Sequence, residues 1–404
     1  MKNWKTKIIS DACTVFEDGD WIESKDQSDE GVRLIQTGNV GNGFFRDRGE
    51  KARYISEATF KRLRCTEIFE GDCLISRLPD PVGRACIIPD TGEKMITAVD
   101  CTIIRFQQKE VLPEWFLFFS LSNEYQKEII KQVTGATRQR ISRKNLGLIE
   151  IPLPSLPEQQ RIVVLLDEAF AAIAKAKANA EQNLNNAKDL FESYLQGVFE
   201  KKGDGWEEKM VNEIGNAQTG TTPKTVEKEN YGDFIPFIKP ADVDFSGIGD
   251  IRYDNEGLSE IGLKKGRKME SSSILMVCIG ATIGKVGFAE KVVSCNQQIN
   301  SLMVKREFEP KFIYYAMTSK EFQNKVLSEG KGAQATLPII NKSKWENLTI
   351  SFPKSKTEQK LFVEKFDALQ NETKKLERIY QDKINDLEEL KKSILQKAFA
   401  GELT

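Results

Sequence analysis

Two stretches of the chain place apolar residues at alternating intervals of four and three, the spacing of a coiled-coil helix. The first extends from Pro157 to about Lys202, and the second from about Ser355 to Ala400 with a local shift of register near Tyr380. We assign to the seam of this coiled coil Leu166, Phe170, Ile173, Leu184, Phe191 and Tyr194 in the first stretch, and Phe366, Leu369, Tyr380, Leu387 and Ile394 in the second.

Each of these predicted helices needs a partner. A helix of about 45 residues is about 65–70 Å long. A narrow apolar stripe, interrupted by Lys177 in the first stretch, makes such a helix marginal on its own in water. Since the other stretch carries the matching stripe, we expect an antiparallel coiled coil. It would place two globular regions at opposite ends, related by a pseudo-twofold axis.

The rest of the chain has a different pattern, in which short apolar runs alternate with Gly, Pro and Asp turns. Such runs predict strands, and one helix interrupts them at about 114–132 and again at about 311–328. The pattern is typical of an α+β domain. We therefore divide the chain into globular regions 1–155 and 204–353 and helical regions 156–203 and 354–404.

The two halves of the chain repeat each other in order. PEWFLFFSLSNEYQK, which begins at Pro113, matches PKFIYYAMTSKEFQN, which begins at Pro310. Glu158-Gln159 likewise matches Glu358-Gln359, and ISRKNLGLIEIPLP matches INKSKWENLTISFP. The sequence is therefore a tandem duplication of a unit of about 200 residues, which fits the length expected of globular domains.

The amino-acid composition excludes several classes of catalytic site. The 404 residues include no histidine, which excludes a Ser-His-Asp nucleophile, an HExxH metal site and a histidine base. The seven cysteines form no C-x-x-C pair, and GATIGKV at Gly280 departs from a phosphate-binding loop in its spacing. With no activated nucleophile, metal cluster or cofactor loop, the chain is interpreted as a binding protein that lacks a metal and a cofactor.

No apolar run approaches the about 20 residues of a membrane span. The start of the chain also lacks the apolar core and cleavage site of a signal peptide. We therefore expect a cytoplasmic protein without a membrane partner.

Candidate ligand contacts lie in polar loops at matched places of the two copies. Arg and Gln side chains form paired hydrogen bonds with guanine and adenine edges, whereas Ser and Thr bond to bases or phosphates. In the loop from Thr134 to Lys144 the candidates are Arg138, Gln139, Arg140, Ser142 and Arg143. In the matching loop of the second copy they are Gln334, Thr336, Asn341 and Lys342. Different side chains on one scaffold are expected if each copy reads a different short sequence.

A second group of candidates lies elsewhere in the globular regions. The matched segments IQTGNV and IKPADV offer Gln36, Thr37, Asn39, Lys239 and Asp242, and isolated positions offer Arg77, Lys285, Gln297 and Gln298. The alternative for every one of these residues is a solvated loop position without a ligand.

The chain resembles the specificity subunit of type I restriction-modification systems over almost its whole length. The segments that carry the resemblance are PLPSLPEQQRIVVLLDEAF from Pro152, SFPKSKTEQKLFVEKFDAL from Ser351, the GATIGKVGFAE turn and the ending LEELKKSILQKAFAGELT. A proline shortly before Glu-Gln at the start of a long helix is present in both copies and is specific, although the second copy has Lys356-Thr357 where the first has Leu156-Pro157.

The resemblance implies that each globular region is a target recognition domain for one half of a bipartite site in double-stranded DNA. The helical regions would fix the distance between the halves and dock two methyltransferase subunits, which restriction-translocation subunits can join. S-adenosylmethionine and ATP would belong to those partners, so this chain would be a noncatalytic subunit without a cofactor.

The charge of the chain does not follow the usual pattern of DNA-binding proteins. The net charge is −1, and no segment carries a large basic excess. Because nonspecific affinity scales with the number of neutralised phosphates, we expect weak DNA binding by the isolated chain, with methyltransferase subunits supplying phosphate contacts. Two alternatives remain, a standalone enzyme acting on nucleic acid and a coiled-coil scaffold without a role in DNA binding.

Overall fold

The computed structural model describes residues 4–135, 139–244, 250–330 and 338–403. The chain forms two compact units. The first unit comprises residues 1–181 and 381–404, and the second comprises residues 182–380. Each of the two long helices is therefore divided between the units. Among the described helices, none combines the length and the apolar character needed to cross a lipid bilayer.

The first unit is built on two sheets and a separate two-stranded ribbon. The antiparallel four-stranded sheet has the order β2 (Cys13–Asp18), β10 (Cys101–Phe106), β7 (Cys73–Ser76), β8 (Ala85–Ile87). The five-stranded sheet has the order β3 (Gln27–Ser28), β5 (Tyr54–Ile55), β4 (Val32–Ile35), β9 (Met95–Thr97), β6 (Glu67–Ile68), in which β4 and β9 run parallel. The ribbon pairs β1 (Lys5–Ile8) with β11 (Glu150–Leu153), and the short helices are α1 (Glu57–Leu63) and α4 (Arg143–Gly147).

The second unit repeats this arrangement strand for strand in its main sheet. The equivalent sheet has the order β13 (Gly215–Thr219), β20 (Ile299–Val304), β17 (Ile274–Val277), β18 (Val286–Phe288). A second sheet has the order β15 (Gly257–Leu258), β14 (Tyr231–Ile238), β19 (Val293–Cys295), β16 (Lys268–Met269). The ribbon pairs β12 (Trp206–Met210) with β21 (Thr349–Pro353), and the short helices are α6 (Val211–Ile214), α7 (Glu260–Lys265) and α10 (Lys342–Glu346).

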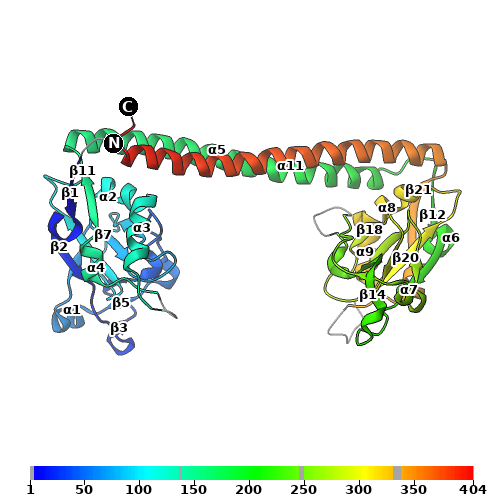
Figure 1. Cartoon of the computed structure of the whole chain (residues 1–404), viewed down its shortest axis with the longest axis horizontal. Coiled ribbons are helices and arrows are strands. Elements are labelled where there is room, and N and C mark those ends of the chain that lie inside the picture. The colour runs from blue at the N-terminus through cyan, green and yellow to red at the C-terminus, as the bar shows by residue number, and fades with distance from the viewer. Residues whose placement is uncertain (1–3, 136–138, 245–249, 331–337, 404) are drawn as a thin grey trace. The chain divides into compact units, whose positions relative to one another are not determined.

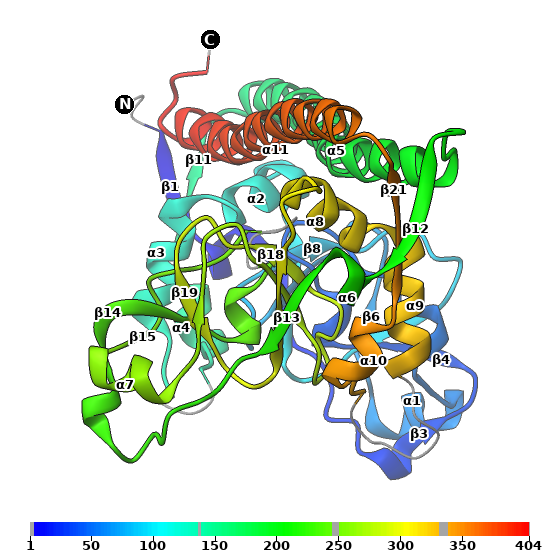
Figure 2. The ribbon, with the colours of Figure 1, turned by 90° about the vertical axis from the view of Figure 1, so that its right-hand side faces the viewer.

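The single helix predicted in each globular region is divided into two. The pairs are α2 (Pro113–Ser120) with α3 (Asn123–Gln132), and α8 (Pro310–Thr318) with α9 (Lys320–Gly330). The break follows from a serine cap, because Ser122 Oγ accepts a hydrogen bond from Tyr125 N and so starts a new helix. Ser319 occupies the same place in the second unit and accepts from Phe322 N. In both views α2 and α8 lie next to the long helices (Figure 1, Figure 2).

The long helices α5 (Leu156–Glu200) and α11 (Lys356–Phe399) form the predicted antiparallel coiled coil. In the first unit Lys177 Nζ lies 2.6 Å from Glu388 Oε1 and the ammonium of Lys391 lies over the ring of Phe170. In the second unit the ring of Phe366 packs against the rings of Tyr194 and Phe199. The apolar cores of both units extend into these helices, so the helices are part of each globular core.

The burial of the assigned seam residues varies along the helices. Leu166, Ile173, Phe191 and Phe366 are buried, whereas Phe170, Leu184, Leu369, Tyr380, Leu387 and Ile394 are half-buried. Tyr194 is exposed, and the next residue, Leu195, is buried in its place. The stripe therefore turns by one residue near the end of α5, where the helix packs on the second globular core.

A buried glutamine near the start of each long helix ties that helix to its globular domain. Gln159 Oε1 accepts a hydrogen bond from Leu112 N at 3.0 Å, and its Nε2 donates to Glu110 O at 2.8 Å and Pro154 O at 3.0 Å. Gln359 repeats the pattern, accepting from Glu309 N at 2.8 Å and donating to Pro353 O at 2.8 Å. The glutamine of the repeated Glu-Gln motif thus has a structural role. It provides hydrogen-bond partners for backbone N–H and C=O groups where sheet, loop and helix meet.

We predict that Gln159→Leu destabilises the first unit selectively. The substitution leaves buried backbone groups without a partner, at about 1–3 kcal/mol for each group. Urea unfolding of the full chain, read by hydrogen exchange, measures the loss, and the second unit serves as an internal reference because Gln359 is unchanged. Gln182→Leu is the control, since within the described part of the chain the Gln182 side chain bonds to Asn186 alone, on the exposed helix surface. Equal protection of both units in Gln159→Leu would contradict this role.

Candidate nucleic-acid interface

The first candidate loop is held to the end of strand β7. Thr134 and Arg140 exchange two backbone hydrogen bonds of 2.9 Å, and Ile141 N donates to Arg77 O at 3.2 Å. Gln139, Arg140, Ser142 and Arg143 are all exposed. Ser142 also caps α4 by accepting from Asn145 N at 3.1 Å. Arg138 lies outside the described residues.

Charged side chains gather beneath this loop. Arg140 Nη2 lies 3.1 Å from Asp100 Oδ1, and Arg77 Nη2 lies 3.2 Å from Asp18 Oδ2. Arg77 is buried, and this burial lowers its pKa, an effect that the nearby Asp18 counters. The Nε of Arg77 has no hydrogen-bond partner among the described residues. Arg77 therefore lies under the surface and supports the loop, while Arg140 reaches the solvent.

The second candidate segment of the first unit is a tight turn at residues 36–39. Gln36 and Thr37 are half-buried, whereas Asn39 is buried. Asn39 Oδ1 accepts a hydrogen bond from Gln36 N at 3.0 Å, and its Nδ2 donates to Arg46 O at 3.0 Å. The Asn39 side chain thus shapes the turn from inside, and Gln36 and Thr37 are the residues that this turn presents at the surface.

Arg84 connects this turn to residues 78–81, the segment that follows Arg77. Its guanidinium donates to Thr37 O at 2.8 Å, Val40 O at 2.7 Å, Leu78 O at 2.7 Å and Pro81 O at 3.1 Å. The side chain is buried, so the four carbonyls fix its position. Arg84 is absent from the residues predicted from sequence, although it aligns with the candidate Lys285 in the repeat, a signal that could have identified it.

The second unit has the same turn at residues 239–242 with different side chains. Lys239 pairs with Glu256, and Asp242 is buried. Asp242 accepts hydrogen bonds from Lys239 N and from Asn255 Nδ2, both at 3.0 Å. Asp242 therefore shapes its turn as Asn39 does in the first unit.

The remaining candidates of the second unit are distributed between a helix start and a strand end. Asn341 caps α10 by accepting from Lys344 N at 2.9 Å, and Lys342 pairs with Glu346 at 3.2 Å. Gln297 is exposed and accepts from Thr222 Oγ1, and Gln298 is half-buried. Gln334 and Thr336 lie outside the described residues.

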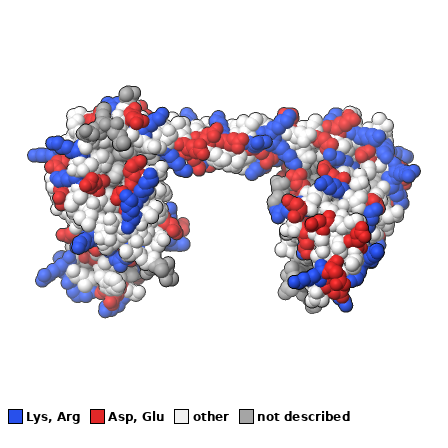
Figure 3. Space-filling model, in the orientation of Figure 1, with Lys and Arg blue, Asp and Glu red and all other residues white. Residues whose placement is uncertain are grey.

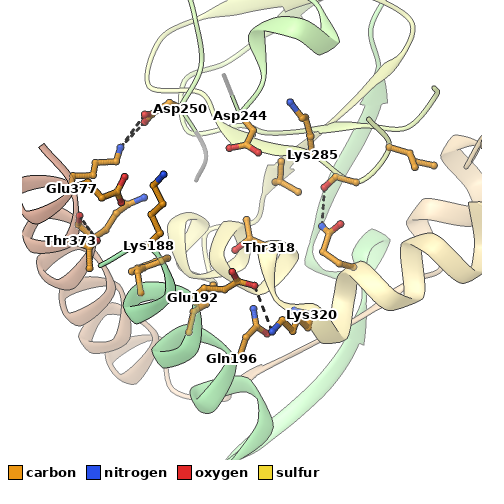
Figure 4. A pocket seen from close by; sticks show the side chains of 18 residues that line it. Lys188, Glu192, Gln196, Asp244, Asp250, Lys285, Thr318, Lys320, Thr373 and Glu377 are labelled. Atoms are coloured by element: carbon orange, nitrogen blue, oxygen red, sulfur yellow. Dashed lines mark hydrogen bonds and ion pairs between the residues drawn. The ribbon is translucent and has the colours of Figure 1, made fainter. Parts of the chain in front are cut away.

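Lys285 lines a pocket of about 910 Å³ within the second unit. Figure 4 shows Asp244 and Lys285 on its globular side and Lys188, Glu192 and Glu377 on the long helices. The pocket contains the ion pairs Lys374–Asp250 at 2.9 Å and Lys320–Glu192 at 3.7 Å. Because its lining carries both signs of charge, the pocket is not a dedicated phosphate site.

The pocket lies where the two copies of the repeat differ by one aromatic side chain. At the matching place of the first unit, Phe170 packs edge-on against Phe118 with ring centroids 5.4 Å apart. Gln370 stands where the first copy has Phe170, and its Oε1 accepts a hydrogen bond from Tyr315 Oη at 3.2 Å. The loss of one aromatic ring is thus accompanied by open space beside the helices.

Neither acid–base chemistry nor a metal centre emerges from the described part of the chain. No three Cys, Asp or Glu side chains there gather as metal ligands. Burial raises the pKa of the Cys13, Cys86, Cys278 and Cys295 thiols to about 12, which makes them poor nucleophiles. On the face shown in Figure 3, acidic and basic side chains are interspersed over each unit. The arrangement therefore fits recognition by a few placed side chains.

Comparison with known proteins identifies the same duplicated architecture. Residues 1–184 and 203–386 match the model of the type I restriction modification DNA specificity domain. A putative type I restriction enzyme MjaX specificity subunit from Methanocaldococcus jannaschii is 21% identical over 424 residues, covering 100% of this chain and 94% of that protein. The HindI specificity subunit of Haemophilus influenzae is 32% identical over 151 residues, 37% of this chain and 32% of that protein.

Solved structures share the fold. A chain from a study of complex assembly and conformational transition of the type I R-M system matches with a TM-score of 0.80 and 18% identity, covering 100% of this chain and 99% of that one. The HsdS subunit from Thermoanaerobacter tengcongensis matches with a TM-score of 0.66 and 17% identity, covering 100% and 98%.

We predict that Arg84→Met loosens the turn at residues 36–39. Removal of the guanidinium takes away four charge-assisted hydrogen bonds to backbone carbonyls, which should lower the free energy of unfolding of the first unit by about 2–4 kcal/mol. Hydrogen exchange at the amides of residues 36–41 should accelerate more than in the second unit. Lys285→Met is the matched control, because Lys285 makes no side-chain hydrogen bond to the described residues. An unchanged exchange rate at residues 36–41 would show that Arg84 does not hold the turn.

Proposed function

The chain belongs to the family of type I restriction-modification DNA specificity proteins, and on that premise we propose that each of its globular regions reads one half of a bipartite DNA site. The chain is the noncatalytic DNA-recognition subunit of such a system. The finer assignment of one half-site to residues 1–155 and the other to residues 204–353 is our proposal.

One observation carries the proposal, namely that a single scaffold is present twice with different polar side chains at equivalent surface positions. The main sheets share one strand order, and both turns are shaped from inside by a buried side chain, Asn39 or Asp242. The surface residues differ, with Gln36 and Thr37 in one turn and Lys239 in the other. A scaffold that is maintained while its surface changes is expected of two readers of different sequences.

The coiled coil supports the second part of the proposal, in which α5 and α11 set the spacing between the half-sites and dock two methyltransferase subunits. Leu190 and Leu390 are exposed on the long helices, and the repeat places them at equivalent positions. Exposed leucines at matched positions suit two copies of one partner. Restriction-translocation subunits would join through that assembly.

The near-neutral charge supports a division of labour between this chain and its partners. Base readout needs few side chains, whereas strong binding to the DNA backbone needs many cations. We propose that the methyltransferase subunits contribute much of the phosphate contact and hold the S-adenosylmethionine. ATP would be used by the restriction-translocation subunits.

Exchange of one globular region tests the proposal directly. Replacing residues 1–155 with the corresponding region of another specificity subunit, in cells that express the methyltransferase, should change one half of the methylated sequence and leave the other half and the gap length unchanged. Sequencing that detects methylated bases gives the readout, and replacing residues 204–353 is the reciprocal experiment. An unchanged methylation pattern would instead favour a scaffold, and methylation or cleavage by the purified chain alone would favour a standalone enzyme.

We predict that Leu190→Asp and Leu390→Asp each remove one methyltransferase subunit from the complex. Burial of one leucine contributes about 1.5–3 kcal/mol, and a carboxylate at the interface adds a desolvation cost. Mass measurement of the assembled complex should show one partner subunit for each single variant and none for the double variant. Asn185→Asp is the control, because it adds the same charge at an exposed position of α5 without removing an apolar contact. Full occupancy in the double variant would exclude this docking surface.

A further inference from the structure

The two globular regions share a backbone frame at the end of their main sheets. In the first, Arg77 follows β7, its N donates to Asp100 O at 2.9 Å, and its O accepts from Ile141 N at 3.2 Å. In the second, Cys278 follows β17, its N donates to Gln298 O at 2.8 Å, and its O accepts from Ile340 N at 2.9 Å. The frame consists of the same three segments joined by the same two hydrogen bonds.

One residue in this frame projects into solvent in both regions. Ile141 and Ile340 are buried and anchor the segment that leads into α4 or α10. Arg140 and Ile339 immediately precede them, and their exposed fractions are similar, 46% for the Arg140 side chain and 48% for Ile339. The two residues therefore occupy the same position of the duplicated scaffold.

The chemistry at this position differs completely between the regions. Arg140 is cationic and lies against the carboxylate of Asp100, whereas Ile339 is apolar. Gln298 stands where the first region has Asp100, but its side chain is engaged with Asn296 Nδ2 at 3.0 Å and Ile279 O at 3.5 Å. The buried anchor is isoleucine in both copies, whereas the exposed position, its supporting residue and the residue after the strand, Arg77 or Cys278, have diverged.

Resting on the proposed function, we propose that Arg140 and Ile339 are equivalent specificity-determining residues that select a G·C pair in the first half-site and an A·T pair in the second. A guanidinium has five N–H donors, so the contact with Asp100 leaves donors for guanine O6 and N7. An isoleucine offers no hydrogen bond, and its favourable contact in the major groove is the C5-methyl group of thymine.

Asp100 is a positioning residue in this arrangement. Its carboxylate limits the rotamers of Arg140, whose own backbone bonds to Thr134 and directly precedes the anchored Ile141. A long side chain that is already ordered loses less entropy when it binds. The second region needs no such support, because a branched side chain such as isoleucine is stiff at χ1.

The experiment uses the complete methyltransferase complex and a plasmid library in which every position of both half-sites is randomised. Methylation of each sequence is read by sequencing for wild type, Arg140→Ile, Arg140→Lys, Asp100→Asn and Ile339→Arg. Lys127→Ala is the matched control, because it removes a positive charge from an exposed residue of α3 in the same globular region that is not a candidate for DNA contact.

We expect Arg140→Ile to reduce a guanine preference at one position of the first half-site by roughly ten- to a hundred-fold, with the second half-site unchanged. Arg140→Lys keeps the charge but loses the paired donors, so it should lose the preference while retaining methylation, even if the isoleucine variant folds poorly. Asp100→Asn should weaken the same preference, whereas Lys127→Ala should leave it intact. Ile339→Arg should replace a thymine preference with guanine in the second half-site only.

Several results would overturn the inference. A wild-type complex whose first half-site has no G·C pair, or whose second has no A·T pair, is incompatible with it. A loss in Arg140→Lys that is equal for all sequences would make Arg140 a phosphate contact. A wild type that methylates no bipartite site would instead refute the proposed function, so the two failures are distinguishable.

Discussion

The apolar seam between α5 and α11 holds both globular cores together. Neither helix could persist alone, because a narrow stripe on a long helix leaves too little apolar surface buried. Each compact unit contains part of α5 and part of α11, and its apolar core includes residues of both helices. Each unit therefore needs both helices to complete its core. Duplication of the sequence provides both helices of the coiled coil in one chain.

The junctions between the helices and the globular domains are maintained by polar contacts rather than by apolar area alone. Gln159 and Gln359 satisfy backbone groups that would otherwise be buried without partners. The junctions differ beside this contact, where Phe170 fills the first and Gln370 borders a pocket in the second. The repeat therefore maintains the residues that fix the connection and varies those that fill the surrounding space.

Within each globular region, support and presentation fall to different residues. Arg77, Arg84, Asn39 and Asp242 are buried, and their side chains bond inside the fold. Gln36, Arg140, Lys239 and Ile339 reach the surface on the backbone that these residues hold. Rigid support lowers the entropy lost when the surface residues meet a ligand, which suits a protein with little net charge to add to its affinity.

The duplication, the antiparallel coiled coil, the α+β class and the absence of histidine chemistry could all be predicted before folding was considered, because they follow from residue type and from spacing along the chain. The sequence also located the turns and loops that carry the candidate site. Which polar residues lie at the surface, and that the predicted helix of each region is divided into two, became clear from the folded chain. Arg84, for example, bonds to Thr37 and Val40, which are distant in sequence, and no local pattern encodes such partners. Periodicity indicates which face of an element is buried, whereas hydrogen-bond partners are set by the packing of segments far apart in the chain.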